Sequence, residues 1–280
     1  MRDSKQYEPA SREKLEQVVA DHRGFIFDLD GTVYLGDELI DDAAEVIEQL
    51  REAGRRTVFL SNKPIARREV YARKLDRLGI PCLAEDVINS PLVLAQYLAE
   101  THPGARVYPV AEEPVIDELR DHGLRMTEEP TETDVVVVSW DRDFNYDKLR
   151  IAYQAAVNGA ELVGTNPDRT CPMPGYDLPD AACMIAAIEA CTERKVDPIV
   201  GKPSPIMLNA ALEELELDRE DCLMFGDRTE TDIRMARDAG ITSVLVLTGV
   251  TDRDHVNAIE IVPDLIMRSI GDLLPVLEEL

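Results

Sequence analysis

The stretch from Phe25 to Val33 constrains the fold more than any other feature, because an apolar run ends there in two carboxylates. Residues i and i+2 of an extended chain point to the same side, so we expect Asp28 and Asp30 to lie together at the carboxyl end of a strand. Open α/β sheets bind ligands at that end of their strands. Two carboxylates held so close repel each other unless a cation or a shared proton relieves them. The alternative is a strand leading into a polar turn, since Asp-Gly is a common turn pair.

Three further segments have the same pattern, in which an apolar strand is followed by polar residues. They are Thr57–Leu60, followed by Ser61 and Asn62; Ile199–Gly201, followed by Lys202; and Cys222–Phe225, followed by Asp227 and then Asp232. We expect these polar groups to converge with the two leading carboxylates around one divalent cation. The alternatives are structural: Ser61 and Asn62 would cap a helix that starts near Ile65, and Lys202 would be a solvated loop residue.

The combination and order of these motifs resemble the haloacid dehalogenase (HAD) superfamily of phosphotransferases, whose motifs run D-x-D-G-T, Ser/Thr, Lys and G-D-x-x-x-x-D. The resemblance is closest to the type-IIA branch, which contains 4-nitrophenyl phosphatases, NagD-like phosphatases and phosphoglycolate phosphatases. The segment Gly164–Asp168, followed by Pro179–Ala181, is similar to the cap-to-core segment of that branch. The chain departs from many members at Lys63 and at Ala182-Cys183, and both departures bear on the substrate.

The resemblance implies a role for each motif residue in phosphate ester hydrolysis. Asp28 would be the nucleophile that forms an aspartyl-phosphate, which divides one difficult step into two. Asp30 would protonate the leaving oxygen and then activate the water that opens the intermediate. The family's dehalogenases lack this second Asp, so its presence argues against carbon–halogen chemistry. Ser61, Asn62 and Lys202 would bind the phosphoryl oxygens.

The resemblance also implies a Mg²⁺ ion, which prefers oxygen ligands and keeps several waters. The side chains of Asp28 and Asp227, with the backbone carbonyl of Asp30, would supply three ligand positions. Asp232 would act one layer further out, orienting a metal-bound water or Lys202.

Strand and helix patterns alternate along the chain, which predicts an α/β fold with a doubly wound parallel sheet. Strands are expected at 24–29, 56–61, 106–110, 134–139, 198–201, 221–226, 242–247 and 263–267, and helices at 9–22, 41–53, 65–78 and 270–279. A chain that leaves one sheet near residue 85 and returns near 195 describes an inserted domain. We therefore predict a core domain from 1–85 and 195–280 and an inserted α/β cap at 86–194, which matches the C2-type cap of the type-II branch.

The formal charge of −25 argues against a nucleic-acid partner, because no basic patch offsets it. The chain has 55 acidic residues but only 7 lysines among its 30 basic ones. Such an acidic, lysine-poor surface suits a salt-rich cytoplasm, where screening weakens the repulsion between like charges.

This charge predicts a salt-dependent stability. We expect the melting temperature to be low at low ionic strength and to rise as salt screens the acidic surface. Thermal unfolding followed by circular dichroism from 0.05 M to about 3 M KCl measures the effect, because the Debye length shrinks across that range. A melting temperature that does not change in molar salt would refute the interpretation.

The other sequence features predict a cytoplasmic protein. No apolar stretch is long enough to span a membrane, and the polar first twenty residues do not form a secretory signal. The five cysteines include no C-x-x-C pair, so we expect buried free thiols, Cys82 and Cys222 among them, and no zinc site.

Together these features predict a Mg²⁺-dependent phosphomonoesterase of a small phosphorylated metabolite, of the sugar, polyol or glycolate phosphate class. 4-Nitrophenyl phosphate would be a surrogate substrate. One alternative is a phosphotransferase or mutase on the same scaffold. The other is a non-catalytic metabolite-binding protein, against which the second carboxylate, Asp30, argues. Caps of this branch often mediate dimers, so a homodimer through the cap is also expected.

Overall fold

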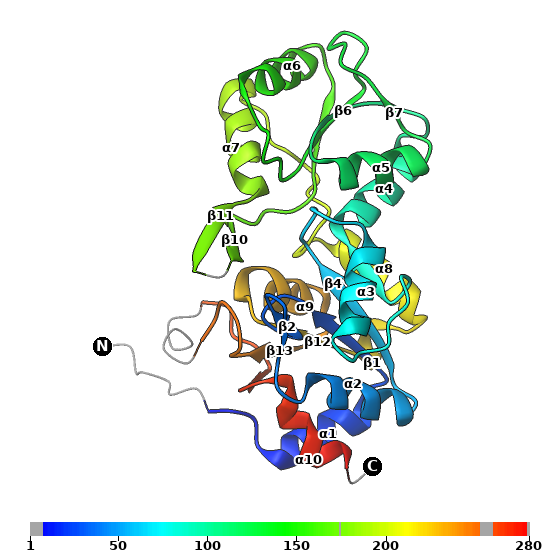
Figure 1. Ribbon diagram of the computed structural model, residues 1–280, viewed down its shortest axis with the longest axis vertical. Helices are drawn as coiled ribbons and strands as arrows, with labels where there is room; N and C mark the ends of the chain where they lie inside the picture. Colours follow the sequence, from blue (N-terminus) through cyan, green and yellow to red (C-terminus); the bar gives the residue numbers. More distant parts are fainter. Residues whose placement is uncertain (1–7, 174, 253–259, 279–280) are drawn as a thin grey trace, which may run out of the picture. The chain divides into compact units, whose positions relative to one another are not determined.

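A computed structural model describes residues 8–173, 175–252 and 260–278 of the chain (Figure 1). The chain divides into two compact units. The core unit comprises Met1–Leu60, Tyr71–Val87 and Leu208–Leu280, and the inserted unit comprises Ser61–Val70 and Ile88–Met207. Each unit contains a sheet with parallel strands and helices around it, so the predicted α/β class is confirmed. The domain boundaries near 85 and 195 stay a prediction; the contacts group residues 61–70 and 195–207 with the inserted unit.

The sheet of the core unit has six strands in the order β14-β13-β12-β1-β4-β5. The strands are β1 (Gly24–Asp28), β4 (Arg56–Ser61), β5 (Val87–Asn89), β12 (Cys222–Gly226), β13 (Thr242–Val246) and β14 (Leu265–Met267). Every pair from β14 to β4 is parallel. From β1 the chain adds β4 and β5 on one side of the sheet, and later β12, β13 and β14 on the other side. The carboxyl ends of β1 and β12 therefore flank the topological switch point, where ligands bind in open α/β sheets.

The central strands of this sheet are apolar because both of their faces are covered. All five residues of β1 are buried, and so are all five of β12. Phe27 stacks on Phe225 of the neighbouring strand with ring centroids 4.8 Å apart. A Phe ring buries a large apolar area, so these contacts fix the register that places the ends of β1 and β12 side by side.

Helices of the core unit lie on both faces of its sheet (Figure 1). Their bounds are α1 (Arg12–Asp21), α2 (Ala43–Glu52), α9 (Arg234–Ala239) and α10 (Leu274–Leu277), while α3 (Arg68–Arg77) and α8 (Pro205–Leu215) cross the sequence boundaries between the units. α10 contacts both α1 and α2, and α9 contacts β13. The hydroxyl of Ser11 accepts the backbone N–H of Lys14 and so caps the start of α1. A short hairpin, β2 (Tyr34–Leu35) and β3 (Glu38–Leu39), follows β1.

Two predicted elements are wrong in detail. The expected core strand at 198–201 is not formed; Ile199 makes only a single parallel bridge to Gly164, which belongs to the inserted unit. Pro198 is the first residue of this segment and Pro203 follows it closely, and proline cannot donate to a strand ladder. The expected helix at 270–279 is a 3-10 helix, Ile270–Leu273, followed by the one-turn α10, and residue 279 lies outside the described residues.

The inserted unit contains a four-stranded parallel sheet in the order β7-β6-β8-β9. The strands are β6 (Arg106–Val110), β7 (Arg125–Met126), β8 (Val135–Val138) and β9 (Glu161–Gly164); the helices are α4 (Ser90–Thr101), α5 (Glu113–Asp121), α6 (Tyr146–Val157) and α7 (Ala181–Thr192). α4 contacts α5, and α6 contacts α7. An antiparallel hairpin, β10 (Thr170–Met173) and β11 (Tyr176–Pro179), precedes α7.

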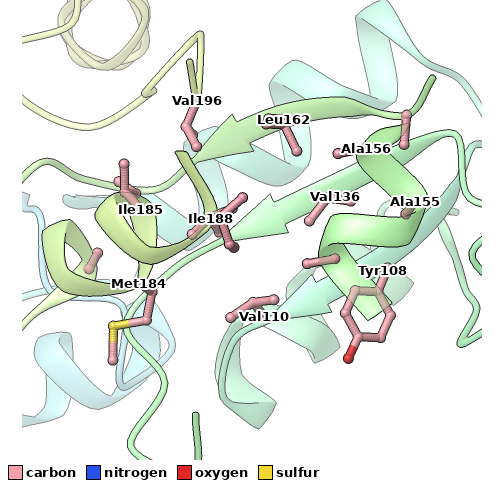
Figure 2. Close-up of a cluster of buried hydrophobic side chains, with 14 of the residues drawn as sticks. Tyr108, Val110, Val136, Ala155, Ala156, Leu162, Met184, Ile185, Ile188 and Val196 are labelled. Carbon is pink, nitrogen blue, oxygen red and sulfur yellow. The ribbon is translucent and has the colours of Figure 1, made fainter. Parts of the chain in front are cut away.

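The core of the inserted unit forms where α6 and α7 pack on one face of this sheet (Figure 2). Ala155 of α6 and Ile188 of α7 face Val136 and Leu162 of the strands. Alanines on α6 allow the helix to approach the sheet closely, while branched residues fill the remaining space at native packing density. The sheet therefore holds rigidly the segment that follows β9, which carries several candidate site residues.

The structure also bears on the expectations for membrane spans and for cysteines. No helix within the described ranges is both long and apolar enough to cross a membrane. All five cysteines are free, but only Cys171 and Cys222 are buried, whereas Cys183 and Cys191 are exposed. Burial raises the pKa of Cys222 to about 12, so this thiol is protonated at neutral pH. The expectation of buried thiols is thus correct for Cys171 and Cys222 but wrong for Cys82, which is only half-buried, and for the two exposed thiols.

Candidate active site

Three buried carboxylates meet in the core unit. Asp28 ends β1, Asp227 follows directly after β12, and Asp232 lies in a π-helical turn at Thr229–Ile233. One oxygen of each lies within 4.8 Å of the others. Their exposed fractions are 7%, 1% and 0%. The parallel pairing of β1 with β12 explains the meeting, because it aligns Phe27 with Phe225 and thus brings the two strand ends together.

The carboxylate of Asp227 is enclosed by main chain. Its Oδ2 accepts the backbone N–H of Val250 at 2.5 Å. A Cβ added to Gly249 would lie 2.6 Å from the Asp227 Cγ and closer still to Oδ2, and one added to Gly31 would lie 2.5 Å from Oδ2. The hydroxyl of Thr248 donates to the carbonyl of Gly31 at 2.6 Å, which joins the two glycine segments. Only glycine allows the main chain to approach this carboxylate so closely.

Asp232 is positioned by the turn in which it lies. Its Oδ2 accepts the backbone N–H of Arg228 at 3.1 Å, and its own N–H donates to the Arg228 carbonyl at 3.1 Å. A Cβ on Gly226 would lie 2.5 Å from the Asp232 Oδ2. The glycine that ends β12 is therefore required for Asp232 to enter the cluster beside Asp227.

This donor set fits a hard divalent cation. Three buried carboxylates carry like charges, and their repulsion in a low-dielectric site is relieved by a bound cation. Among the described residues the cluster contains only oxygen donors, which Mg²⁺ prefers, and neither the His nor the Cys ligands typical of zinc. The predicted metal ligands Asp28 and Asp227 are thus brought together, and Asp232 belongs to the same cluster.

The inserted unit brings together two of the residues predicted to bind phosphate. Asn62 and Lys202 are 140 positions apart, yet the Asn62 Oδ1 accepts the Lys202 backbone N–H at 2.7 Å and its Nδ2 donates to the Lys202 carbonyl at 3.0 Å. Ser61, which ends β4, accepts the backbone N–H of Lys63 at 3.2 Å. Ser61 and Lys202 are each only 3% exposed.

The two structural alternatives for these residues are wrong. α3 begins at Arg68, too far along the chain for Ser61 or Asn62 to cap it. Lys202 is buried, which is rare for a lysine without a charged partner or ligand, so it is not a solvated loop residue.

Comparisons with known proteins agree with this geometry. Two family models match the chain, haloacid dehalogenase-like hydrolase over residues 25–125 and HAD-hydrolase-like over residues 199–273. The sugar-phosphatase AraL of Bacillus subtilis is 38% identical over 256 residues, which cover 91% of this chain and 93% of that protein. The chain belongs to the haloacid dehalogenase-like hydrolase family.

Solved HAD structures have the same fold as this chain. A p-nitrophenyl phosphatase from Archaeoglobus fulgidus matches with a TM-score of 0.87 at 30% identity, covering 93% of this chain and 100% of that one. A glycerol phosphate phosphatase from Mycobacterium tuberculosis, solved in complex with magnesium, matches with a TM-score of 0.83 at 31% identity and coverages of 91% and 77%. The predicted HAD family and its 4-nitrophenyl phosphatase branch are confirmed.

Sequence reasoning did not single out Tyr34, which the HAD core unit places beside Asp30. Its ring is fully buried, the Gly31 N–H donates to its carbonyl at 2.7 Å, and the ammonium of Lys74 lies 3.6 Å from the ring centroid. Burial, followed by the charge of Asp30, raises the pKa of Tyr34, so the phenol is neutral at physiological pH. Its position two residues after the Gly-Thr turn is the only sequence signal for it.

Proposed function

We propose that this protein is a Mg²⁺-dependent phosphomonoesterase that hydrolyses a small phosphorylated metabolite of the sugar, polyol or glycolate phosphate class. The observation that carries the proposal is the buried carboxylate cluster, in which Asp28, Asp227 and Asp232 bring their oxygens within 4.8 Å of one another. Relatives named sugar-phosphatase and glycerol phosphate phosphatase support the substrate class. The 4-nitrophenyl phosphatases among the structural relatives support the surrogate substrate.

The proposed Mg²⁺ would be held by the side chains of Asp28 and Asp227 and by the backbone carbonyl of Asp30. Asp232 would act through a water, since Mg²⁺ retains part of its hydration. When bound, the ion supplies positive charge that neutralises the carboxylates and the phosphate ester. Without that charge, the nucleophile and the phosphate dianion would repel each other.

The residues of the chain would carry out two successive displacements at phosphorus. A carboxylate oxygen of Asp28 forms the new P–O bond while the ester P–O bond breaks, and Asp30 gives its proton to the leaving alkoxide. Asp30 then takes a proton from a water molecule. That water attacks phosphorus, breaks the bond to Asp28 and releases inorganic phosphate. We assign the binding of the phosphoryl oxygens to Ser61, Asn62 and Lys202.

We also propose that the enzyme is cytoplasmic. The free, partly buried cysteines suit a reducing cytoplasm. A homodimer through the inserted unit remains a prediction, and sedimentation velocity would measure it.

Removal of the metal is expected to abolish turnover. Hydrolysis of 4-nitrophenyl phosphate should stop in EDTA and return when Mg²⁺ is added in excess. Mg²⁺ should also raise the melting temperature without any substrate, because a ligand at 100 times its Kd stabilises the native state by about 2.7 kcal/mol. Turnover that survives exhaustive EDTA dialysis would contradict the proposal. The same assay, run in high salt with glycolate, glycerol, hexose and nucleoside phosphates and pyridoxal phosphate, would identify the substrate.

A further inference from the structure

The side chain of Asn62 clamps the main chain of Lys202. Its amide pairs with both backbone groups of that lysine, at 2.7 Å to the N–H and 3.0 Å to the carbonyl. Two hydrogen bonds from one planar group fix both the position and the direction of the peptide they bind. The main chain of Lys202 is therefore held by a residue that precedes it by 140 positions.

The clamp uses all the donors that the Asn62 side chain has. An amide carries two N–H groups, and here one donates to the Lys202 carbonyl and the other to Asp168 Oδ2 at 2.8 Å. No side-chain N–H of Asn62 is left for a phosphate. This side chain thus acts on the phosphate-binding residues by holding Lys202, and any direct contact of Asn62 with phosphate would come from its backbone.

Asp168 stabilises one of the two ways in which the Asn62 amide can face. A carboxylate can only accept hydrogen bonds, so the NH₂ side of the amide must face Asp168 and the oxygen must face the Lys202 N–H. A reversed amide would place its oxygen against both the carboxylate and the Lys202 carbonyl, and its NH₂ against the Lys202 N–H, and all these contacts would be repulsive. The carboxylate therefore stabilises the same orientation that binds Lys202 and holds the amide in it by a further hydrogen bond.

Asp168 is itself held in a polar network inside the inserted unit. Its Oδ2 also accepts the Nδ2 of Asn166 at 2.9 Å, and Asn166 donates to Asp180 Oδ1 at 3.0 Å. Asp180 caps α7, and Asn166 is fully buried. A half-buried carboxylate that accepts two amide donors, one of them from the buried Asn166, has little freedom to move.

The chain next to Lys202 is equally constrained. The Gly201 N–H donates to the Thr165 carbonyl at 2.7 Å. A Cβ on Gly201 would lie 2.5 Å from that carbonyl oxygen and 2.6 Å from the Asn62 Oδ1. The segment that follows β9 thus contacts the Lys202 segment directly through Thr165, and it contacts Asn62, which holds Lys202, through Asp168.

We propose that Asp168 is a positioning residue for phosphate binding: it orients the Asn62 amide, and the amide sets the place of Lys202. This inference rests on the proposed role of Lys202 in binding the phosphoryl group. A site of this kind gains affinity when its charged group is held in place before the ligand arrives.

The inference is tested with Asp168→Ala, the isosteric Asp168→Asn and a control. Asp168→Ala removes the acceptor, so the Kd of inorganic phosphate should rise about 10-fold or more and kcat/KM for 4-nitrophenyl phosphate should fall by a similar factor. Asp168→Asn can present its carbonyl oxygen to both amide donors, so both constants should stay within about 3-fold of wild type. The control Asp177→Ala removes an exposed carboxylate of the hairpin and should change neither constant.

A second readout separates positioning from general damage to the fold. The rise in melting temperature caused by Mg²⁺ should be the same in Asp168→Ala as in wild type, because the carboxylate cluster belongs to the core unit. Equal phosphate affinity in Asp168→Ala and wild type would overturn the inference, and so would an equal loss in Asp168→Asn. If Asp168→Ala does not fold, Asp168→Ser takes its place. A wild-type protein that releases no phosphate would refute the proposed function, while its Kd for inorganic phosphate would still test the clamp.

Discussion

Replacing Asp28 by asparagine is expected to abolish phosphate release, lowering kcat by at least about 10⁴-fold. An amide oxygen is a poor nucleophile and carries no charge with which to form the aspartyl-phosphate. The neutral side chain also removes one of the two carboxylates that would bind Mg²⁺ directly, in the cluster that Asp28, Asp227 and Asp232 form. Phosphate release from 4-nitrophenyl phosphate, measured in single-turnover and steady-state assays with excess Mg²⁺, gives the size of the loss.

The same substitution is expected to stabilise the metal-free protein. Asp28 lies buried beside Asp227 and Asp232, so removing its charge removes two like-charge repulsions. In EDTA the Asp28→Asn variant should therefore melt at or above the wild-type temperature, an exchange of stability for activity that is common at active sites. Asp37→Asn, at a fully exposed carboxylate of the same unit, is the matched control and should leave activity and melting temperature unchanged. Unchanged turnover in Asp28→Asn would remove Asp28 as the nucleophile.

Gly249→Ala is expected to produce the second large effect, a loss of metal affinity of about 10- to 100-fold. The new methyl group would lie 2.6 Å from the Asp227 Cγ and closer to Oδ2, so either the carboxylate or the main chain must move. Asp227 is 1% exposed, and its Oδ2 is held by the backbone N–H of Val250, so a displacement would break that hydrogen bond. The Mg²⁺ concentration that gives half-maximal activity, and the one that gives a half-maximal shift in melting temperature, both report the loss.

The loss of metal affinity in Gly249→Ala would come from the steric clash alone, because Gly249 does not have a left-handed φ and alanine brings no backbone strain there.

Gly54→Ala is the control, because it brings backbone strain without a steric clash. Gly54 has a φ of +74° with no atom near its Cβ position, so alanine should cost about 1–2 kcal/mol of stability and leave the Mg²⁺ requirement unchanged. If Gly249→Ala binds Mg²⁺ as tightly as the Gly54 variant does, then Asp227 is not a metal ligand.

The carboxylate cluster could be anticipated from the sequence because its cause is local. Apolar runs that end in Asp28 and in Gly226-Asp227 predict strands, and parallel strands align their carboxyl ends at one sheet edge. The structure confirms the strands and brings the two carboxylates together. For Asp232, the sequence predicted only a position one layer outside the metal ligands. The π-helical turn that contains Asp232 brings its carboxylate beside those of Asp28 and Asp227.

Other parts of the site depend on contacts between distant segments, which no local pattern encodes. The pattern at 198–201 predicted a core strand, yet Ile199 bridges to Gly164, because the flanking prolines limit ladder hydrogen bonds. The glycine at 249 is a turn residue by sequence, and only the structure shows that it makes room for Asp227.

By itself, the sequence determined the family, the α/β class and the chemical identity of the candidate residues, since apolar periodicity and motif order are properties of the chain alone. The tertiary structure decided which of these side chains meet and what each can donate or accept. It placed Asp168 against Asn62, across 106 positions, and Asn62 against Lys202, so that a residue assigned to phosphate became a clamp on a neighbour. The physical reason is that a hydrogen bond acts over about 3 Å, and only the folded chain brings groups so far apart in sequence within that distance.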